Sequence, residues 1–205
     1  MKSRNTIGIL LILACCSLSC NTLKEIQKGL TNLSRCKFKL DSVNNFSLVG
    51  IPLSGKSSIG FADAAKLTMA FARNEFPASF TLNVAAVNPN DGTGGTTKSS
   101  ATLTSFAWTL ILDNTLTING NIANAISIPG TGQQSIIPLQ MNLDLAKFFK
   151  DKGYESVINL ALALGGANSS PSRITLRAKP TINTDFGPIT YPGEIDIIDK
   201  EFRTQ

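Results

Sequence analysis

Histidine is absent from the 205-residue sequence, and charged residues make up only 16% of it. Without an imidazole, the chain cannot build a Ser-His-Asp triad, a histidine general base or a zinc site with a histidine ligand. The formal net charge of +5 is too small a bias to indicate nucleic-acid binding. We therefore expect no nucleic-acid partner, no cofactor, no metal and no enzymatic activity.

Cysteine is also scarce, and three of the four cysteines, Cys15, Cys16 and Cys20, lie within the first twenty residues. Cys36 is the one cysteine further along the chain, so no internal disulfide framework is expected. The sequence leaves two interpretations of Cys36 open. It is a small buried apolar residue or, as the sharper alternative, a reactive thiol.

An apolar run long enough to span a bilayer is missing near the start of the chain. The run at residues 7–14 falls far short of the roughly 20 residues that a spanning helix needs. It follows the basic residues Lys2 and Arg4 and precedes a group of small residues, which is the layout of an export signal. The alternative is an ordinary secretory signal with incidental cysteines.

A cysteine preceded by small residues is the pattern that lipoprotein signal peptidase reads, and Cys20, after residues 17–19, is the favoured acylation site. Cys15 and Cys16 are the alternatives. Several acyl chains, each contributing about 0.8 kcal/mol per buried methylene, would hold the protein stably on a membrane. Asn21 stands where an aspartate would signal retention in the inner membrane, and this favours the outer membrane.

The chain is accordingly divided into three parts. Residues 1–19 are predicted to be a lipoprotein signal peptide, and residues 20–35 the acylated cysteine followed by a short amphipathic linker helix. Residues 36–205 are predicted to form one domain. Hydrophobic residues make up 42% of the sequence, which is enough for one ordinary core.

Alternation of apolar and polar residues dominates this third part. The pattern runs from Cys36 to Val43, after which a turn-rich stretch is expected. It returns over residues 80–86, 106–112, 126–143, 174–178 and 189–198. Runs of strands without a helix between each pair favour antiparallel sheets packed as a sandwich. The Gly-, Thr- and Ser-rich stretch from Asp91 to Ser100 is expected to be a loop that is long for a hairpin, and it is either functional or, as we favour, mobile.

Helical spacing occurs at two places in the same part. Residues 62–74 carry Ala64, Leu67, Ala70 and Phe71 at helical spacing, without Gly or Pro. Residues 144–164 break the alternation, most simply as a pair of helices interrupted near Gly153.

Residues 50–57 satisfy the pattern of a phosphate-binding loop, Gly-x4-Gly-Lys-Ser. That chemistry needs backbone N–H groups around the phosphate and a helix that starts directly after Lys56. Pro52 removes one of these donors, and Gly60 lies where the helix should already be running. Nucleotide binding is therefore only a remote alternative, and we interpret the glycines as turn residues with Lys56 exposed.

The stretch from Phe80 to Asn90, with Asn88-Pro89-Asn90 at its end, resembles the strand and Asn-Pro-Asn motif of the late embryogenesis abundant type 2 family, also called the water stress and hypersensitive response domain. The segments at 106–120, 126–143 and 180–192 are similar to the later strands of that family. Residues 36–40 resemble the Cys-x-Phe-x-Leu segment of its bacterial lipoprotein members. The resemblance covers roughly residues 36–198.

The resemblance implies an antiparallel immunoglobulin- or fibronectin-like β-sandwich, here with two or three accessory helices, and an association with stress tolerance. It brings no catalytic residue with it. Asn88, Pro89 and Asn90 are expected to be structural, because the Asn88 side chain can bond to its own backbone where the chain turns.

Two non-enzymatic functions follow from these observations. The first is a membrane-anchored binding or stress-protective module of the cell envelope, with an envelope protein as partner. The second is a carrier for an apolar ligand or lipid, held between the sheets or under the helices at 62–74 and 144–164.

Overall fold

The computed structural model describes residues 23–24, 27, 31–54, 59–93, 98–165, 174–184 and 187–198. They form two antiparallel sheets with helices at the ends, which confirms the mainly β, sandwich-like fold predicted from the alternation. Residues 31–35 are helical and lead directly into the first strand.

Sheet A contains four strands in the order β2-β1-β3-β7. They are β2 (Ile51–Pro52), β1 (Lys37–Leu48), β3 (Pro77–Val87) and β7 (Gln134–Asp144). β3 and β7 pair without a register shift over their whole length, from Pro77 opposite Asp144 to Val87 opposite Gln134. An uninterrupted register keeps every second side chain of both strands on the same face.

Sheet B contains six strands, with the central path β10-β8-β4-β5. They are β10 (Ile195–Ile197), β8 (Ile174–Thr184), β4 (Ala101–Leu112) and β5 (Thr115–Gly120), with β6 (Ile126–Ile128) on β4 and β9 (Gly187–Thr190) on β8. The longest pairing joins β4 to β8, so these two strands form the centre of the sheet.

The core lies between the inner faces of the two sheets. On β3 the alternating residues Phe80, Leu82 and Val84 are at most 2% exposed. On β4 the buried set includes Phe106 and Leu110. The rings of Phe38 on β1 and Phe106 on β4 lie 5.6 Å apart and join the two sheets.

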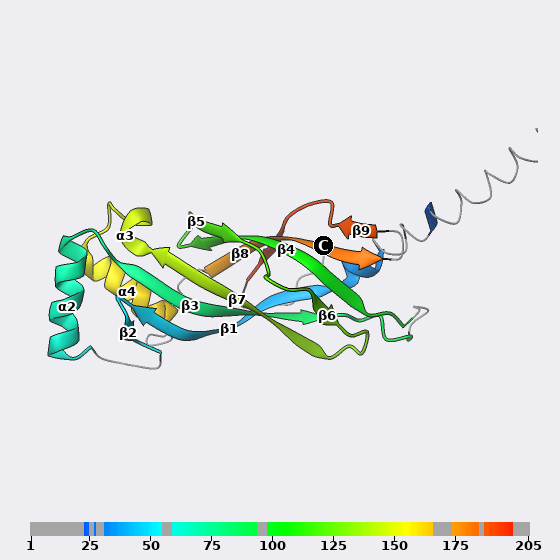
Figure 1. The fold of residues 1–205 in the computed structure, drawn as a ribbon, viewed down its shortest axis with the longest axis horizontal. Helices are drawn as coiled ribbons and strands as arrows, with labels where there is room; N and C mark the ends of the chain where they lie inside the picture. Colours follow the sequence, from blue (N-terminus) through cyan, green and yellow to red (C-terminus); the bar gives the residue numbers. More distant parts are fainter. Residues whose placement is uncertain are drawn as a thin grey trace, which may run out of the picture.

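Figure 1 shows an elongated molecule whose two ends are built differently. One end carries three helices, α2 (Phe61–Ala72), α3 (Leu145–Phe148) and α4 (Tyr154–Leu164). The other end carries the helical residues 31–35, the end of β3 and strands β6 and β9. The helices at 61–72 and on both sides of Gly153 confirm the predictions made from helical spacing.

Two local expectations from the alternation are corrected. The first strand does not end at Val43, because β1 continues to Leu48 with register shifts, and Asn45 takes a φ of 54° there. Asparagine tolerates this left-handed conformation, and the register shift between Asn44 and Ser47 is a bulge within the strand, so the turn comes only at Val49 and Gly50. The alternation at 189–198 belongs to two short strands, β9 and β10, because residues 191–194 turn between them.

Candidate functional site

The buried polar side chains of the described structure lie in the Asn-Pro-Asn segment that follows β3. Asn88 is 0% exposed and Asn90 is 1% exposed, and they are the buried polar side chains of the described core. Burying an amide group is unfavourable unless its donors and acceptors find partners. The two side chains therefore identify a place where the chain has arranged specific hydrogen bonds.

Asn88 uses both ends of its side-chain amide. Its Oδ1 accepts hydrogen bonds from the backbone N–H of Asn90 at 3.1 Å and from Asn90 Nδ2 at 2.8 Å. Its Nδ2 donates to the backbone oxygen of Ser99 at 2.9 Å and to that of Ile128 at 3.1 Å. One residue thus connects the turn at Pro89, the end of the loop before β4, and β6.

Asn90 extends the same network to the segment that precedes β1. Its Nδ2 donates to the backbone oxygen of Asn32 at 3.2 Å, and Asn32 Nδ2 donates to Ser99 Oγ at 3.2 Å. Among the described residues, Asn90 Oδ1 has no partner. We call Asn32, Asn88, Asn90 and Ser99 the asparagine node.

Gly130, in the connection between β6 and β7, packs closely against the backbone of two residues of the node, Asn90 and Ser99. A Cβ atom built on Gly130 would lie 2.3 Å from the backbone oxygen of Asn90 and 2.3 Å from that of Ser99. No real side chain tolerates such distances, so glycine is required by close packing of backbone against backbone. The backbone N–H of Gly132 also donates to the oxygen of Asn88 at 3.1 Å.

The residues between the node and β1 are packed into the core. Leu33 is 1% exposed and Cys36 is 5% exposed. Cys36 Sγ donates a weak hydrogen bond to the backbone oxygen of Asn32 at 3.6 Å. Burial raises the pKa of the Cys36 thiol from 9.0 to about 11, so the reactive thiolate form is disfavoured. Of the two interpretations of Cys36, the structure therefore favours a small buried apolar residue over a reactive thiol.

The chemistry available at the node is limited by its residue types. Carboxamide and hydroxyl groups neither ionise near neutral pH nor act as nucleophiles without a neighbouring base. The described residues contain no cluster of three or more His, Cys, Asp or Glu that could hold a metal ion. The arrangement holds four chain segments together, and it fits a structural role for Asn88, Pro89 and Asn90.

The described residues around the phosphate-binding pattern at 50–57 do not form a strand that is followed directly by a helix. β1 runs through a tight turn at Gly50 into β2, and both strands are antiparallel. Leu53 is fully buried and its N–H donates to the oxygen of Phe46. Lys56 lies outside the described residues, but helix α2 begins only at Phe61.

The predicted acylation site Cys20 and its alternatives Cys15 and Cys16 also lie outside the described residues. Within the described part of the chain, no helix is both long and apolar enough to cross a bilayer. The acylation therefore stays a prediction from the sequence.

Aromatic side chains contact one another between the sheets and under helix α2, the two places that the sequence offers for an apolar ligand. Phe46 and Phe80 lie 5.8 Å apart between the sheets. Under helix α2, Phe71 contacts the rings of Phe76 at 5.7 Å and Tyr154 at 5.3 Å. The carrier function stays a prediction that native mass spectrometry of membrane-purified protein would test through bound lipid.

The sequence pointed to Asn88, Pro89 and Asn90 but missed Asn32, Ser99 and Gly130. Their importance comes from contacts between segments distant in the chain, and Asn32 and Asn90 are 58 positions apart. The one available signal was the Pro129-Gly130 pair, which indicates a turn but not what packs against it.

The chain was also compared with known proteins. No protein-family model matches it, and no curated protein matches it. A solved structure of a protein from Archaeoglobus fulgidus aligns over 82% of this chain and 98% of that chain, with 10% sequence identity and a TM-score of 0.34. We draw no functional conclusion from a likeness of this size.

Proposed function

We propose that this protein is a non-enzymatic, lipid-anchored module of the cell envelope, similar to the late embryogenesis abundant type 2 family, and that it binds an envelope partner or protects under stress. Acylation at Cys20 would hold it on a membrane, with the outer membrane favoured. Its function would then depend on contact and not on catalysis.

The asparagine node is the observation that supports this proposal best. The chain that follows the proposed anchor is held by the hydrogen bond from Asn90 to Asn32 and by the burial of Leu33 and Cys36. A chain acylated at Cys20 would thereby enter the sandwich at the helical residues 31–35, which these contacts hold against the end of β3.

The separation of the two ends supports the same interpretation. The helical residues 31–35 lie at one end of the elongated sandwich, and α2, α3 and α4 lie at the other (Figure 1). A molecule held by its first end would present the helical end away from the anchor. This arrangement suits a module that contacts something at a distance from its own membrane.

Metabolic labelling with a fatty-acid analogue, followed by membrane fractionation, tests the anchor. We expect label on the wild-type protein and recovery in the membrane fraction. Cys20→Ser should lose the label and accumulate as an unprocessed chain, whereas Cys15→Ser and Cys16→Ser should keep both label and processing. Label that survives Cys20→Ser but is lost in one of the other variants would move the anchor to that cysteine.

Cross-linking in intact cells tests the binding part of the proposal. We expect a reproducible cross-linked envelope partner with the wild-type chain, and loss of that partner when the anchor is removed. An unlabelled, unprocessed wild-type chain recovered from the cytosol would contradict the proposed function as a whole.

A further inference from the structure

Helix α2 packs against the sandwich through only part of its surface. Leu67 is its one fully buried residue, and Phe71 reaches the rings of Phe76 and Tyr154. Asp63, Ala64 and Ala70 are half-buried. These residues account for the side of the helix that faces the protein.

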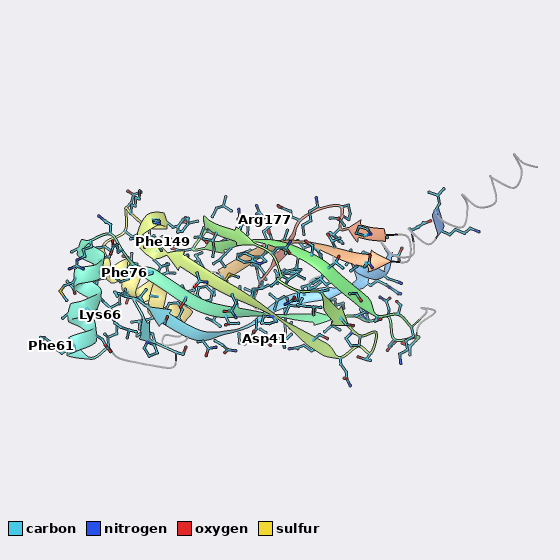
Figure 2. All side chains as sticks on the ribbon, viewed as in Figure 1. Asp41, Phe61, Lys66, Phe76, Phe149 and Arg177 are labelled. Atoms are coloured by element: carbon cyan, nitrogen blue, oxygen red, sulfur yellow. The ribbon has the colours of Figure 1, made fainter. Side chains whose placement is uncertain are left out.

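The opposite side of α2 is also apolar, which is unusual for a helix on the surface of a protein. Phe61 is 93% exposed and Met69 is 56% exposed. Ala62, Ala65 and Ala72 are exposed at spacings that place them on the same side. We call these five residues the α2 outward face, and Figure 2 shows Phe61 at the far end of the molecule, with Phe76 and Phe149 towards the sheets.

The charges beside this face have one sign. Lys66 and Arg73 are exposed along one flank, and neither forms an ion pair with any described residue. The acidic residues nearby lie elsewhere: Asp63 is half-buried on the protein side, and Glu75 follows the end of the helix. The outward half of α2 therefore combines exposed apolar side chains with two cations that have no ion-pair partner among the described residues.

This combination is complementary to the surface of an anionic bilayer. Phe61 and Met69 can enter the boundary between headgroups and acyl chains. The long stems of Lys66 and Arg73 can stay in apolar contact while their charged ends reach lipid phosphates. A stable protein interface, by contrast, takes about 20–30 residues on each side, many more than this face offers.

We propose that the α2 outward face binds the surface of an anionic lipid bilayer. The helix lies at the end of the sandwich opposite residues 31–35, so this contact is separate from any acyl anchor and does not require one. In a chain that is held in one membrane by its amino-terminal segment, α2 would touch a second, facing lipid surface.

Vesicle clustering tests the proposal with the full-length chain. The protein is reconstituted into donor vesicles and mixed with protein-free acceptor vesicles that contain phosphatidylglycerol or only phosphatidylcholine. We expect light scattering to rise with the anionic acceptors and to stay low with the zwitterionic ones. Raising the salt concentration should weaken clustering, because it screens the contribution of Lys66 and Arg73.

Two pairs of substitutions identify the surface. Phe61→Ser with Met69→Ser should slow clustering by roughly tenfold, since both apolar contacts with lipid are lost. Lys66→Glu with Arg73→Glu should abolish the preference for anionic acceptors. The matched control is Leu116→Ser with Ile136→Ser, because these two side chains are 61% and 42% exposed on the sheets and should not affect clustering.

Three outcomes would overturn the proposal. The first is no clustering by wild-type chain that flotation places in the donor vesicles, or, for chain that stays outside them, no co-sedimentation with anionic vesicles. The second is clustering or co-sedimentation that the Phe61 and Met69 substitutions leave unchanged. The third is clustering only when the acceptor vesicles also carry the protein, which would show that α2 pairs with a second copy. Far-UV circular dichroism of each variant confirms that the exposed substitutions leave the fold intact.

Discussion

At the scale of single residues, the asparagine node shows how much depends on a few side chains. Asn88 joins three segments through two donated and two accepted hydrogen bonds, and none of its partners belongs to β3. A buried amide that loses its partner leaves the other groups unsatisfied, which costs more than the hydrogen bond itself contributes. Substitutions at the node should therefore act on stability before they act on binding.

Gly130→Ala tests the close approach of backbones at the node. The added methyl group would meet the backbone oxygens of Asn90 and Ser99, and backbone atoms cannot rotate away as a flexible side chain could. We expect the free energy of unfolding in urea to fall by about 2–3 kcal/mol. Gly193→Ala is the control, because nothing lies within 4 Å of a Cβ at that position; equal effects at both glycines would contradict the packing account.

The Cys36 thiol predicts a loss of stability at alkaline pH. Its pKa is about 11 in the folded protein against an ordinary value of 9.0, so the unfolded chain releases this proton first as the pH rises. The stabilisation is fully present below pH 9 and is lost between pH 9 and 11. As the pH rises from 9 to 11, the free energy of unfolding of the wild type should fall by about 2–3 kcal/mol relative to that of Cys36→Ala.

Urea unfolding of both proteins across this pH range measures the effect. The comparison with Cys36→Ala cancels the contributions of tyrosines and lysines that titrate in the same range. A difference between the two proteins that does not change with pH would show that the thiol is not buried as described.

At the scale of elements, helix α3 is tied to strand β3 by one carboxylate. Asp144 Oδ1 accepts hydrogen bonds from the backbone N–H of Phe76 at 2.8 Å and from that of Ala146 at 3.1 Å. The residue thus caps α3 and fixes the first turn of the helix beside the start of β3. A carboxylate at this position also opposes the partial positive charge of the helix N-terminus.

Asp144→Ala should lower the free energy of unfolding by about 1–2 kcal/mol. Asp144→Asn keeps an acceptor oxygen, so it should lower the free energy of unfolding by less than half of that amount. Asn142→Ala, which changes an exposed residue of the same strand, serves as the control in thermal unfolding. If Asp144→Asn and Asp144→Ala lowered the stability equally, the negative charge of Asp144 and not its hydrogen bonds would account for its contribution.

At the scale of the whole molecule, β7 is an exposed edge of sheet A. The strand has 11 residues, and its outward side chains carry no charge before Asp144 at its end. Long uncharged edges invite pairing with other chains, and proline prevents it because it lacks the N–H that a further strand would use. Pro138, which is exposed in the middle of β7, is placed to do this.

Pro138→Val should therefore increase self-association. We expect a several-fold lower concentration for the onset of light scattering, with little change in the fold of the monomer. Pro188→Val in the four-residue strand β9 is the matched control, because a short edge offers few hydrogen bonds. Unchanged scattering after Pro138→Val would mean that another feature protects this edge.

Local patterns of apolar and polar residues were enough to predict which face of most strands and helices is buried. Phe80, Leu82 and Val84 alternate with polar neighbours and lie in the core. The helical spacing around Leu67 predicted α2, and Gly153 marked the break between α3 and α4. These predictions succeeded because a local repeat of two or of 3.6 residues decides which side chains share a face.

How these faces meet depends on contacts between segments that are distant in the chain. Ile136 and Ile137 are equally apolar, but Ile137 is fully buried and Ile136 is 42% exposed, because the register with β3 sets the direction of each. Likewise, the burial of Asn90 and the need for glycine at 130 arise from contacts with Asn32 and Ser99. A periodic pattern records which side of an element is apolar, whereas partners distant in the chain are chosen only when the sheets and loops pack together.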